Sequence, residues 1–366
     1  MPCRGNPGGE QAKVIPFQTK SRLPVSCAVR STVYPWQSRT HTPQTTDASF
    51  YCFTYLPIYR FTYLPFYLFA VLPIYRFTYL PFYLFTVLPI PSSLAWNPYA
   101  RQVISFADYD GAISLFDANA GSVSCELKEH EKRVWSLDFS TLDPTLLCSG
   151  SDDGLVKVWS TSQRQSAATI KCRANVCSVQ FSPVNANVVA FSSAAHQTHV
   201  YDLRRTQRPL VVLAGHKRAV SYVKWLGAHQ LITASTDNTL KLWDVTRGFD
   251  GVNGAACDPC VRTFGGHQNK RNFVGMDVSK DGRIVCGSED NTVCLFSKSV
   301  PTPVAMTSLS LTAAWGHQTK SQQQTPAEKP GLFVSAVAWS PCGERVLAAN
   351  SCGAVKVLEL THDESS

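Results

Sequence analysis

The segment "THVYDLRRTQ" places Tyr201, Asp202 and Arg204 within four residues. A carboxylate can hold a nearby guanidinium by a charge-assisted hydrogen bond and so present it as a fixed cation. Two neighbouring segments, "VKVWSTS" and "LKLWDVT", end in the same way but with tryptophan and without this arginine. From these residues alone, the segment is either a degenerate copy of a repeated strand ending or a surface that binds a partner.

Patterns typical of enzymes are missing from the sequence. There is no nucleophile constellation, no glycine-rich phosphate loop and no paired His-x-x-x-His site. Cys257 and Cys260 in "ACDPCV" have the spacing of half a zinc site, but no second pair follows at zinc-finger distance. We therefore expect no enzymatic activity, no metal and no cofactor, and we expect the 13 scattered cysteines to be free thiols.

The charge of the chain is concentrated near its beginning. Of the formal net charge of +8 over 366 residues, +6 falls within residues 1–90 and only +2 within the rest. The basic excess therefore says little about what a folded domain would bind, and nucleic acid is not an expected partner.

Residues 56–69, "LPIYRFTYLPFYLF", are repeated without substitution at residues 72–85. This apolar stretch is long enough to raise the question of a membrane span. A proline recurs every eight residues, however, and each costs about 3 kcal/mol inside a helix. Arg60 and Arg76 would add a further cost near the bilayer centre. We expect residues 1–88 to be a low-complexity, disordered region that does not enter a membrane.

A second period organises the chain after Pro91. Strands of similar sequence end at intervals of 43, 42, 42, 53 and 62 residues, in "AISLF", "VKVW", "THVY", "LKLW", "VCLF" and "VKVL". A period of about 40–45 residues with Gly-His and Trp-Asp pairs is the signature of WD40 propeller blades. The sequence therefore predicts an all-β WD40 propeller of the seven-bladed type, with six recognisable blades, over residues 89–361, followed by a tail at 362–366.

Polar residues recur at fixed places within these blades. Gly215-His216 opens the blade that Trp243 closes, and an aspartate, Asp237, stands six residues before that tryptophan. Buried polar groups must be paired, because each unsatisfied one costs about 1–3 kcal/mol. We expect His216, Asp237 and Trp243 to belong to a structural hydrogen-bond network and not to a catalytic site. Six residues before the other strand-ending aromatics stand Asp110, Asp153 and Asp290, whereas Ala195 and Cys352 mark degenerate blades.

Closure of the ring is the open question of the propeller model. Either residues 70–90, with "LFTVLPIP", supply a substitute strand, or the propeller is incomplete.

Several segments resemble one plant family throughout residues 94–360: "EHEKRVWSLDFS", "GHKRAVSYVKW", "HQNKRNFVG" and "ANSCGAVKVLEL". They are similar to the C-terminal propeller of the photomorphogenesis regulators, which comprise the constitutive-photomorphogenic ubiquitin ligase and the suppressor-of-phytochrome-A proteins. "TASTDNTLKLWD" and "TFGGH" look more like the suppressor branch. The RING, coiled coil and kinase-like regions of these regulators have no counterpart in residues 1–90, so the chain resembles a propeller-only member.

The resemblance implies a peptide-binding face. In this family one propeller face binds extended Val-Pro peptides with acidic flanks, in a hydrophobic slot beside cations. The matching positions here are Tyr109, Arg133, Trp135, Arg218 and Phe273. Two positions depart from the family: Ile90 stands where a lysine is usual and Lys270 where a glutamate is usual. We therefore expect Val-Pro recognition with an altered preference for the flanking residues.

The resemblance also bears on Tyr201, Asp202 and Arg204. Tyr/Trp-Asp-x-Arg at a blade end is how WD40 substrate receptors dock on the damaged-DNA-binding adaptor of cullin ligases. The expected function is a non-enzymatic adaptor that couples Val-Pro-bearing transcription factors or photoreceptors to such a ligase, together with the photomorphogenic ligase and suppressor proteins. The expected location is the nucleus, with the cytoplasm as the alternative. The competing functions are repression of UV-B photoreceptor signalling and a scaffold without a working peptide slot.

Overall fold

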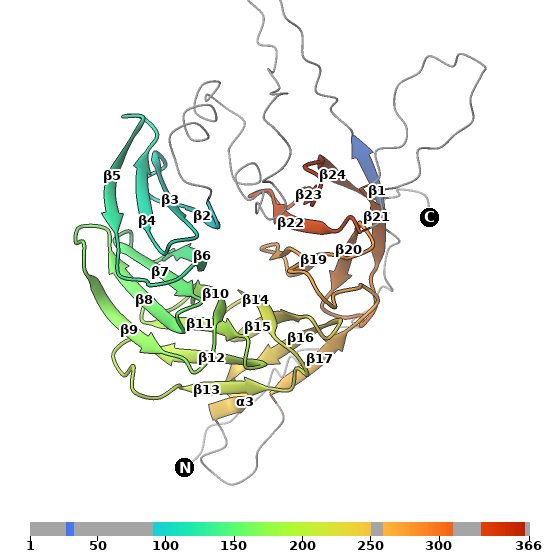
Figure 1. The fold of residues 1–366 in the computed structure, drawn as a ribbon. Helices are drawn as coiled ribbons and strands as arrows, with labels where there is room; N and C mark the ends of the chain where they lie inside the picture. The colour runs from blue at the N-terminus through green and yellow to red at the C-terminus, as the bar shows by residue number, and fades with distance from the viewer. Residues whose placement is uncertain (1–26, 33–90, 250–258, 310–330, 363–366) are drawn as a thin grey trace, which may run out of the picture.

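The computed structural model of the chain describes residues 27–32, 91–249, 259–309 and 331–362. These residues are almost all strand, with one five-residue helix among them, α3 (Val245–Phe249). They form six four-stranded antiparallel sheets that follow one another around an arc (Figure 1). The predicted all-β WD40 propeller with six recognisable blades is confirmed.

The first three blades are continuous in sequence. The first consists of β2 (Ser93–Trp96), β3 (Val103–Ala107), β4 (Ile113–Asp117) and β5 (Ser122–Leu127). The second consists of β6 (Val134–Phe139), β7 (Leu146–Ser151), β8 (Leu155–Ser160) and β9 (Ser166–Lys171). The third consists of β10 (Val176–Phe181), β11 (Val188–Ser193), β12 (Gln197–Asp202) and β13 (Val211–Ala214).

The last three blades include the longer insertions. The fourth consists of β14 (Val220–Trp225), β15 (Gln230–Ser235), β16 (Thr239–Asp244) and β17 (Cys260–Phe264). The fifth consists of β18 (Met276–Val278), β19 (Arg283–Gly287), β20 (Thr292–Ser297) and β21 (Ala305–Ser308). The sixth consists of β22 (Val334–Trp339), β23 (Arg345–Asn350), β24 (Val355–His362) and β1 (Cys27–Thr32). The inner strands of the six sheets are β2, β6, β10, β14, β18 and β22 (Figure 1).

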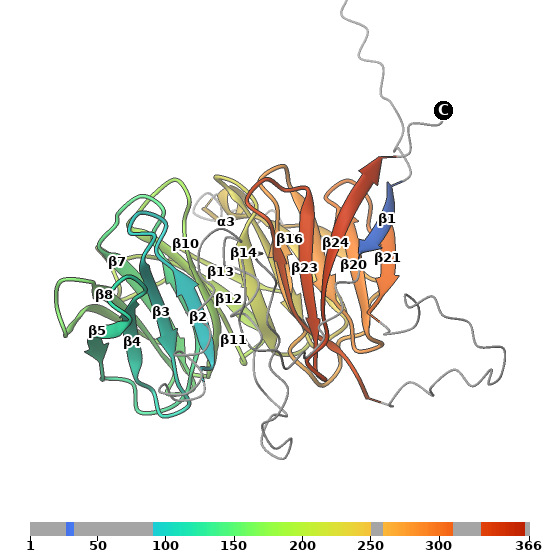
Figure 2. The same cartoon turned by 90° about the horizontal axis from the view of Figure 1, so that it is seen from above.

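The outer strand of the sixth blade comes from the N-terminal region. β1 pairs antiparallel with β24, from Cys27 opposite His362 to Thr32 opposite Val357, and lies beside it in Figure 2. Residues 27–32 therefore differ from the prediction that placed all of residues 1–88 outside the propeller. Their pairing satisfies backbone groups along the edge of β24 that would otherwise stay free. The donor that the sequence suggested, residues 70–90, lies outside the described residues.

Each blade packs against the next through buried apolar side chains. Because both faces of an inner blade are covered, strands such as β8 are buried at four successive positions, Val156 to Trp159. Within a strand the side chains alternate, so that Val158 packs toward the third blade and Trp159 toward the first. Five such clusters fill the five seams between consecutive blades. No comparable cluster within the described parts of the chain joins the first blade to the sixth.

The innermost strands are also joined by hydrogen bonds across the seams. In three seams, a polar side chain of one inner strand accepts from a backbone N–H of the next: Asp138 from Phe181 at 2.8 Å, Gln180 from Trp225 at 2.7 Å and Asp277 from Trp339 at 2.8 Å. The equivalent residue of the fourth blade is Lys224, which cannot accept and instead lies 3.5 Å from Asp277. These bonds fix the inner strands around a central channel and so hold its two mouths in shape.

Candidate functional site

Four of the five predicted peptide-binding residues meet at one mouth of the channel. The Arg133 guanidinium lies 4.0 Å from the ring centroid of Tyr109 and 4.7 Å from that of Trp135. The Trp135 ring meets Phe273 edge to face, with centroids 5.3 Å apart. Stacking on aromatic rings favours a cation when both are partly desolvated. We call Tyr109, Arg133, Trp135 and Phe273 the channel-mouth cluster.

These four side chains come from three different blades. Tyr109 belongs to the turn between β3 and β4, Arg133 and Trp135 to the start of β6, and Phe273 to the segment before β18. Phe273 therefore reaches the cluster from the fifth blade, across the ring from the second. Burial raises the pKa of Tyr109, and nearby Arg133 only partly opposes this rise, so the phenol stays neutral.

Two acidic residues hold the cluster in place, and the sequence reasoning did not identify either of them as site residues. Asp152 accepts a hydrogen bond of 2.6 Å from the Trp135 indole N–H and another of 2.8 Å from Asn175. Glu289 accepts from the backbone N–H groups of Arg271 and Asn272, at 2.6 and 2.7 Å, and so fixes the segment that carries Phe273. Burial alone would raise the pKa of Glu289, but these hydrogen bonds outweigh it and lower the pKa.

Beneath the cluster the channel forms a cavity of about 520 Å³, which Trp135 and Phe273 also line. This volume lies in the range of sites that enclose small ligands or a few side chains. The cavity is also lined by Asp138, Lys224 and Asp277, which occupy equivalent positions of the inner strands of the second, fourth and fifth blades. Burial raises the pKa of Asp138 to about 7, against the opposing effects of the Phe181 N–H and of Lys224.

Arg218, the fifth predicted residue, lies beside the cluster and not within its stack. It is exposed and donates from Nη1 to the carbonyl oxygen of Lys270 at 3.2 Å. Lys270 and Arg271 are exposed on the same segment as Phe273. The substitution of Lys270 for the family's glutamate therefore adds a cation here, whereas Ile90 lies outside the described residues.

Tyr201, Asp202 and Arg204 lie at the opposite end of the blade from the channel-mouth cluster. Tyr201 and Asp202 are buried, whereas the Arg204 side chain is 67% exposed. Asp202 accepts from both Nε and Nη2 of Arg204, the shortest contact being 2.6 Å, and from its backbone N–H at 2.9 Å. Hydrogen bonds from Arg204 hold the pKa of Asp202 below its usual range. The carboxylate therefore presents Arg204 outward, as the sequence predicts.

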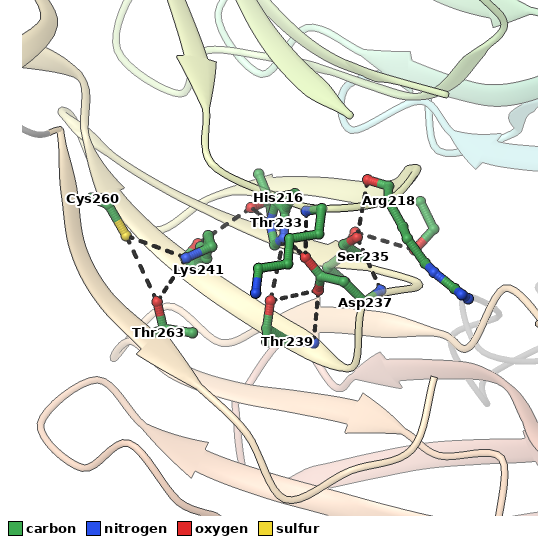
Figure 3. A network of polar contacts seen from close by, with 12 residues as sticks. His216, Arg218, Thr233, Ser235, Asp237, Thr239, Lys241, Cys260 and Thr263 are labelled. Atoms are coloured by element: carbon green, nitrogen blue, oxygen red, sulfur yellow. Dashed lines mark hydrogen bonds and ion pairs between the residues drawn. The ribbon is translucent and has the colours of Figure 1, made fainter. Parts of the chain in front are cut away.

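The predicted structural network is present in the fourth blade, and Figure 3 shows its members His216, Thr233 and Asp237. His216 bonds to Asp237 through Nδ1 at 3.0 Å and to the Thr233 hydroxyl through Nε2 at 2.7 Å, and the Trp243 indole donates to the same hydroxyl at 2.8 Å. Burial alone would raise the pKa of Asp237, but hydrogen bonds from His216, Thr239 and the Lys217 N–H lower it well below its usual range. The histidine and aspartate are therefore structural.

A second copy of this network occurs in the second blade, at a histidine that the Gly-His signature missed. His130 bonds to Asp153 and to the Ser149 hydroxyl, both at 2.7 Å, and Trp159 donates to Ser149 at 2.8 Å. His130 follows Glu129 and not glycine, so the dipeptide pattern does not mark it. The spacing of Asp153 and Trp159 is the signal that could have found it.

The network is incomplete in the fifth blade despite its Gly266-His267 pair. Both ring nitrogens of His267 are buried without a hydrogen-bond partner. Cys286 stands ten residues before Phe296, where the fourth blade has Thr233 before Trp243, so the bridging hydroxyl is replaced by a thiol and the indole by a phenyl ring. Burial lowers the pKa of His267 to about 4, against opposing effects from Asp237 and Asp290.

The described residues contain neither a cluster of metal ligands nor a helix that could cross a membrane. No group of histidine, cysteine, aspartate or glutamate within residues 27–32, 91–249, 259–309 and 331–362 is arranged to hold a metal ion. Cys257 of the Cys-x-x-Cys pair lies outside these ranges, and Cys260 lies in β17 with its Sγ 3.9 Å from the Thr263 hydroxyl. Among the described residues no helix has the length and apolar character needed to cross a bilayer.

Comparison of the sequence with known proteins assigns the chain to a family. The family model described as "Nucleolar protein 10-like, N-terminal domain", a β-propeller, matches residues 91–332. The chain is 42% identical over 269 residues to Protein SPA1-RELATED 3 of Arabidopsis thaliana, covering 74% of this chain and 30% of that protein. It is 42% identical over 271 residues to the E3 ubiquitin-protein ligase COP1 of Pisum sativum, covering 74% and 37% respectively.

A shorter relative is covered more fully. The chain is 37% identical over 232 residues to the WD repeat-containing protein RUP1 of Arabidopsis thaliana, covering 62% of this chain and 58% of that protein. The chain therefore spans less than two thirds of the length of each of these relatives. The chain belongs to the β-propeller family of the nucleolar protein 10-like N-terminal domain, and its WD40 propeller is of the kind found in COP1 and the SPA1-related proteins.

Proposed function

We propose that the channel-mouth cluster binds an extended Val-Pro peptide with acidic flanking residues. The observation that supports this most is the packing of the Arg133 guanidinium between the Tyr109 and Trp135 rings, with Phe273 closing the row. Flat aromatic faces suit the rigid proline ring and the branched valine, since both lose little conformational entropy on binding. Arg133 is already desolvated on two sides, so a carboxylate beside it gains a strong charge-assisted bond.

The charges around the cluster favour an acidic peptide. Arg218, Lys270 and Arg271 are exposed next to Phe273. Asp152 and Glu289, the nearby acids, are already engaged by hydrogen bonds from protein groups. Because Lys270 adds a cation at the flank, we expect tighter binding of peptides with acidic residues on that side.

The second part of the proposal concerns Arg204. Held by Asp202 on the opposite face, Arg204 offers a cation to the adaptor of a cullin-based ubiquitin ligase, and both faces could then be occupied at once. The chain would act as a non-enzymatic adaptor in light signalling, located in the nucleus, that brings Val-Pro-bearing transcription factors or photoreceptors to the ligase. The names of its relatives support this context, because they include an E3 ubiquitin-protein ligase and a protein named as a suppressor of PHYA-105.

Fluorescence anisotropy tests the peptide site. A labelled acidic Val-Pro peptide is titrated with the full chain and with a Trp135→Ala variant, for which we expect affinity to fall about tenfold or more, as for a buried aromatic anchor. Tyr99→Ala is the matched control, since Tyr99 is an aromatic residue that is 50% exposed on the opposite face. Equal affinity of all three proteins would exclude the channel-mouth cluster as the site, and absence of binding by the unmodified chain would favour a scaffold without a peptide slot.

A further inference from the structure

The face that carries Arg204 also exposes a row of apolar side chains. Tyr99, Leu142 and Val184 are 50%, 46% and 55% exposed, and they belong to the first, second and third blades. Each stands in the turn between the first two strands of its blade. The three turns are alike, because the N–H of each apolar residue donates to the side chain two positions earlier, Asn97, Ser140 or Ser182.

The turn itself does not demand an apolar residue at this position. In the fifth and sixth blades the same place, two residues after Ser279 and Ser340, is taken by Asp281 and by the exposed Cys342. Exposing a large apolar side chain in water gives no stability to the fold, since burial is the source of hydrophobic stabilisation. Three such residues at equivalent points of three adjacent blades therefore indicate a surface with a use.

The row adjoins the segment of Arg204. The Tyr99 hydroxyl donates to the Thr141 carbonyl at 2.5 Å, so the first turn lies against the second beside Leu142. At the other end, the Leu203 N–H donates to the Asn187 carbonyl at 2.7 Å, which attaches the segment of Arg204 to the turn that carries Val184. The first turn is therefore attached to the second, and the third turn is attached to the segment of Arg204.

We propose that Tyr99, Leu142 and Val184 form one docking surface with Arg204, and that its occupant is the ligase adaptor. This inference rests on the proposed function and deepens it, because it specifies what the adaptor must offer. A carboxylate would lie opposite Arg204, with apolar side chains along the row. The arrangement matches the usual composition of an interface, an apolar centre with a charged group that sets the register.

Charge decides against occupants from this chain. Arg205 and Arg208 are exposed beside Arg204, so the edge of the surface is strongly basic. A second copy of the chain docking on this face through its own matching face would bring these arginines together. Residues 1–90 of the chain carry a net charge of +6 and would also be repelled. An acidic partner protein is the occupant that the surface fits.

The test measures binding of the full chain to the purified adaptor by biolayer interferometry. A Leu142→Ser/Val184→Ser variant is expected to bind about tenfold more weakly or worse, as is Arg204→Ala. The matched control is Val304→Ser/Met306→Ser, which changes two aliphatic residues, 37% and 49% exposed, at the outer strand β21. Because all these side chains are at the surface, equal melting temperatures should show that every variant is folded.

The outcomes separate the inference from the proposed function. Weak binding by both the Leu142/Val184 and Arg204 variants, with a normal control, supports the shared surface. Loss on Arg204→Ala alone overturns the role of the apolar row but leaves the docking proposal standing. No loss with either variant, or no binding by the unmodified protein, overturns both.

Discussion

Replacing Thr233 by valine should destabilise the propeller much more than its small chemical change suggests. The Thr233 hydroxyl bonds to His216 Nε2 at 2.7 Å and accepts from the Trp243 indole at 2.8 Å, and its side chain is fully buried. Valine keeps the shape of the side chain but leaves His216 Nε2 and the Trp243 indole N–H without their hydroxyl partner. At about 1–3 kcal/mol for each of these two buried unsatisfied groups, the free energy of unfolding should fall by about 2–6 kcal/mol. That is a large share of the roughly 5–15 kcal/mol typical of a folded domain.

Urea unfolding followed by tryptophan fluorescence measures this difference. Thr263→Val is the matched control. Thr263 lies in the outer strand of the same blade, is exposed, and accepts a hydrogen bond of 2.8 Å from Lys241. We expect the control to change stability by less than about 0.5 kcal/mol. If the two valine variants unfold at the same urea concentration with equal slopes, the bridging role of the Thr233 hydroxyl is refuted.

Three further predictions concern other parts of the propeller. Burial lowers the pKa of His267 to about 4, whereas the pKa of an unfolded histidine is about 6.5. Between these two pH values the unfolded state binds one more proton than the folded state. The free energy of unfolding should therefore be at its full value above pH 6.5 and fall by at most about 3 kcal/mol toward pH 4. Urea unfolding at several pH values should show a flatter profile for His267→Gln, and parallel profiles would contradict this. Hydrogen bonding from Ser340 lowers the pKa of the exposed Cys342 thiol, whereas burial raises the pKa of the Cys286 thiol well above its usual range. Iodoacetamide at pH 7.5 should therefore modify Cys342 much faster than Cys286, which peptide mass spectrometry after a short pulse measures. Comparable rates at the two cysteines would contradict this prediction. Removing residues 1–32 should expose the edge of β24 and speed amide hydrogen exchange there while leaving β8 unaffected, and unchanged exchange in β24 would disprove the pairing.

The repeat made most of the fold predictable from sequence. Strand endings such as "VKVW" and "LKLW" mark each blade, and apolar residues at alternate positions decide which neighbour each side chain faces. The network of His216, Asp237 and Trp243 could be predicted because its members keep a fixed spacing within one blade. The contact of Asp202 with Arg204 was predictable for the same reason, since only one residue separates the partners.

Contacts between distant segments could be decided only by the tertiary structure. Trp135 and Phe273 meet across the channel from the second and fifth blades, and β1 pairs with β24 from the opposite end of the chain. Neither contact leaves a periodic signal, because each depends on how the blades curve around the ring. The incomplete network at His267 shows the same limit: its Gly-His pair satisfies the pattern, but hydrogen bonding depends on whether a hydroxyl lies within reach, and Cys286 provides none. Sequence spacing determined the blades, and the packing of blades against one another determined the sites.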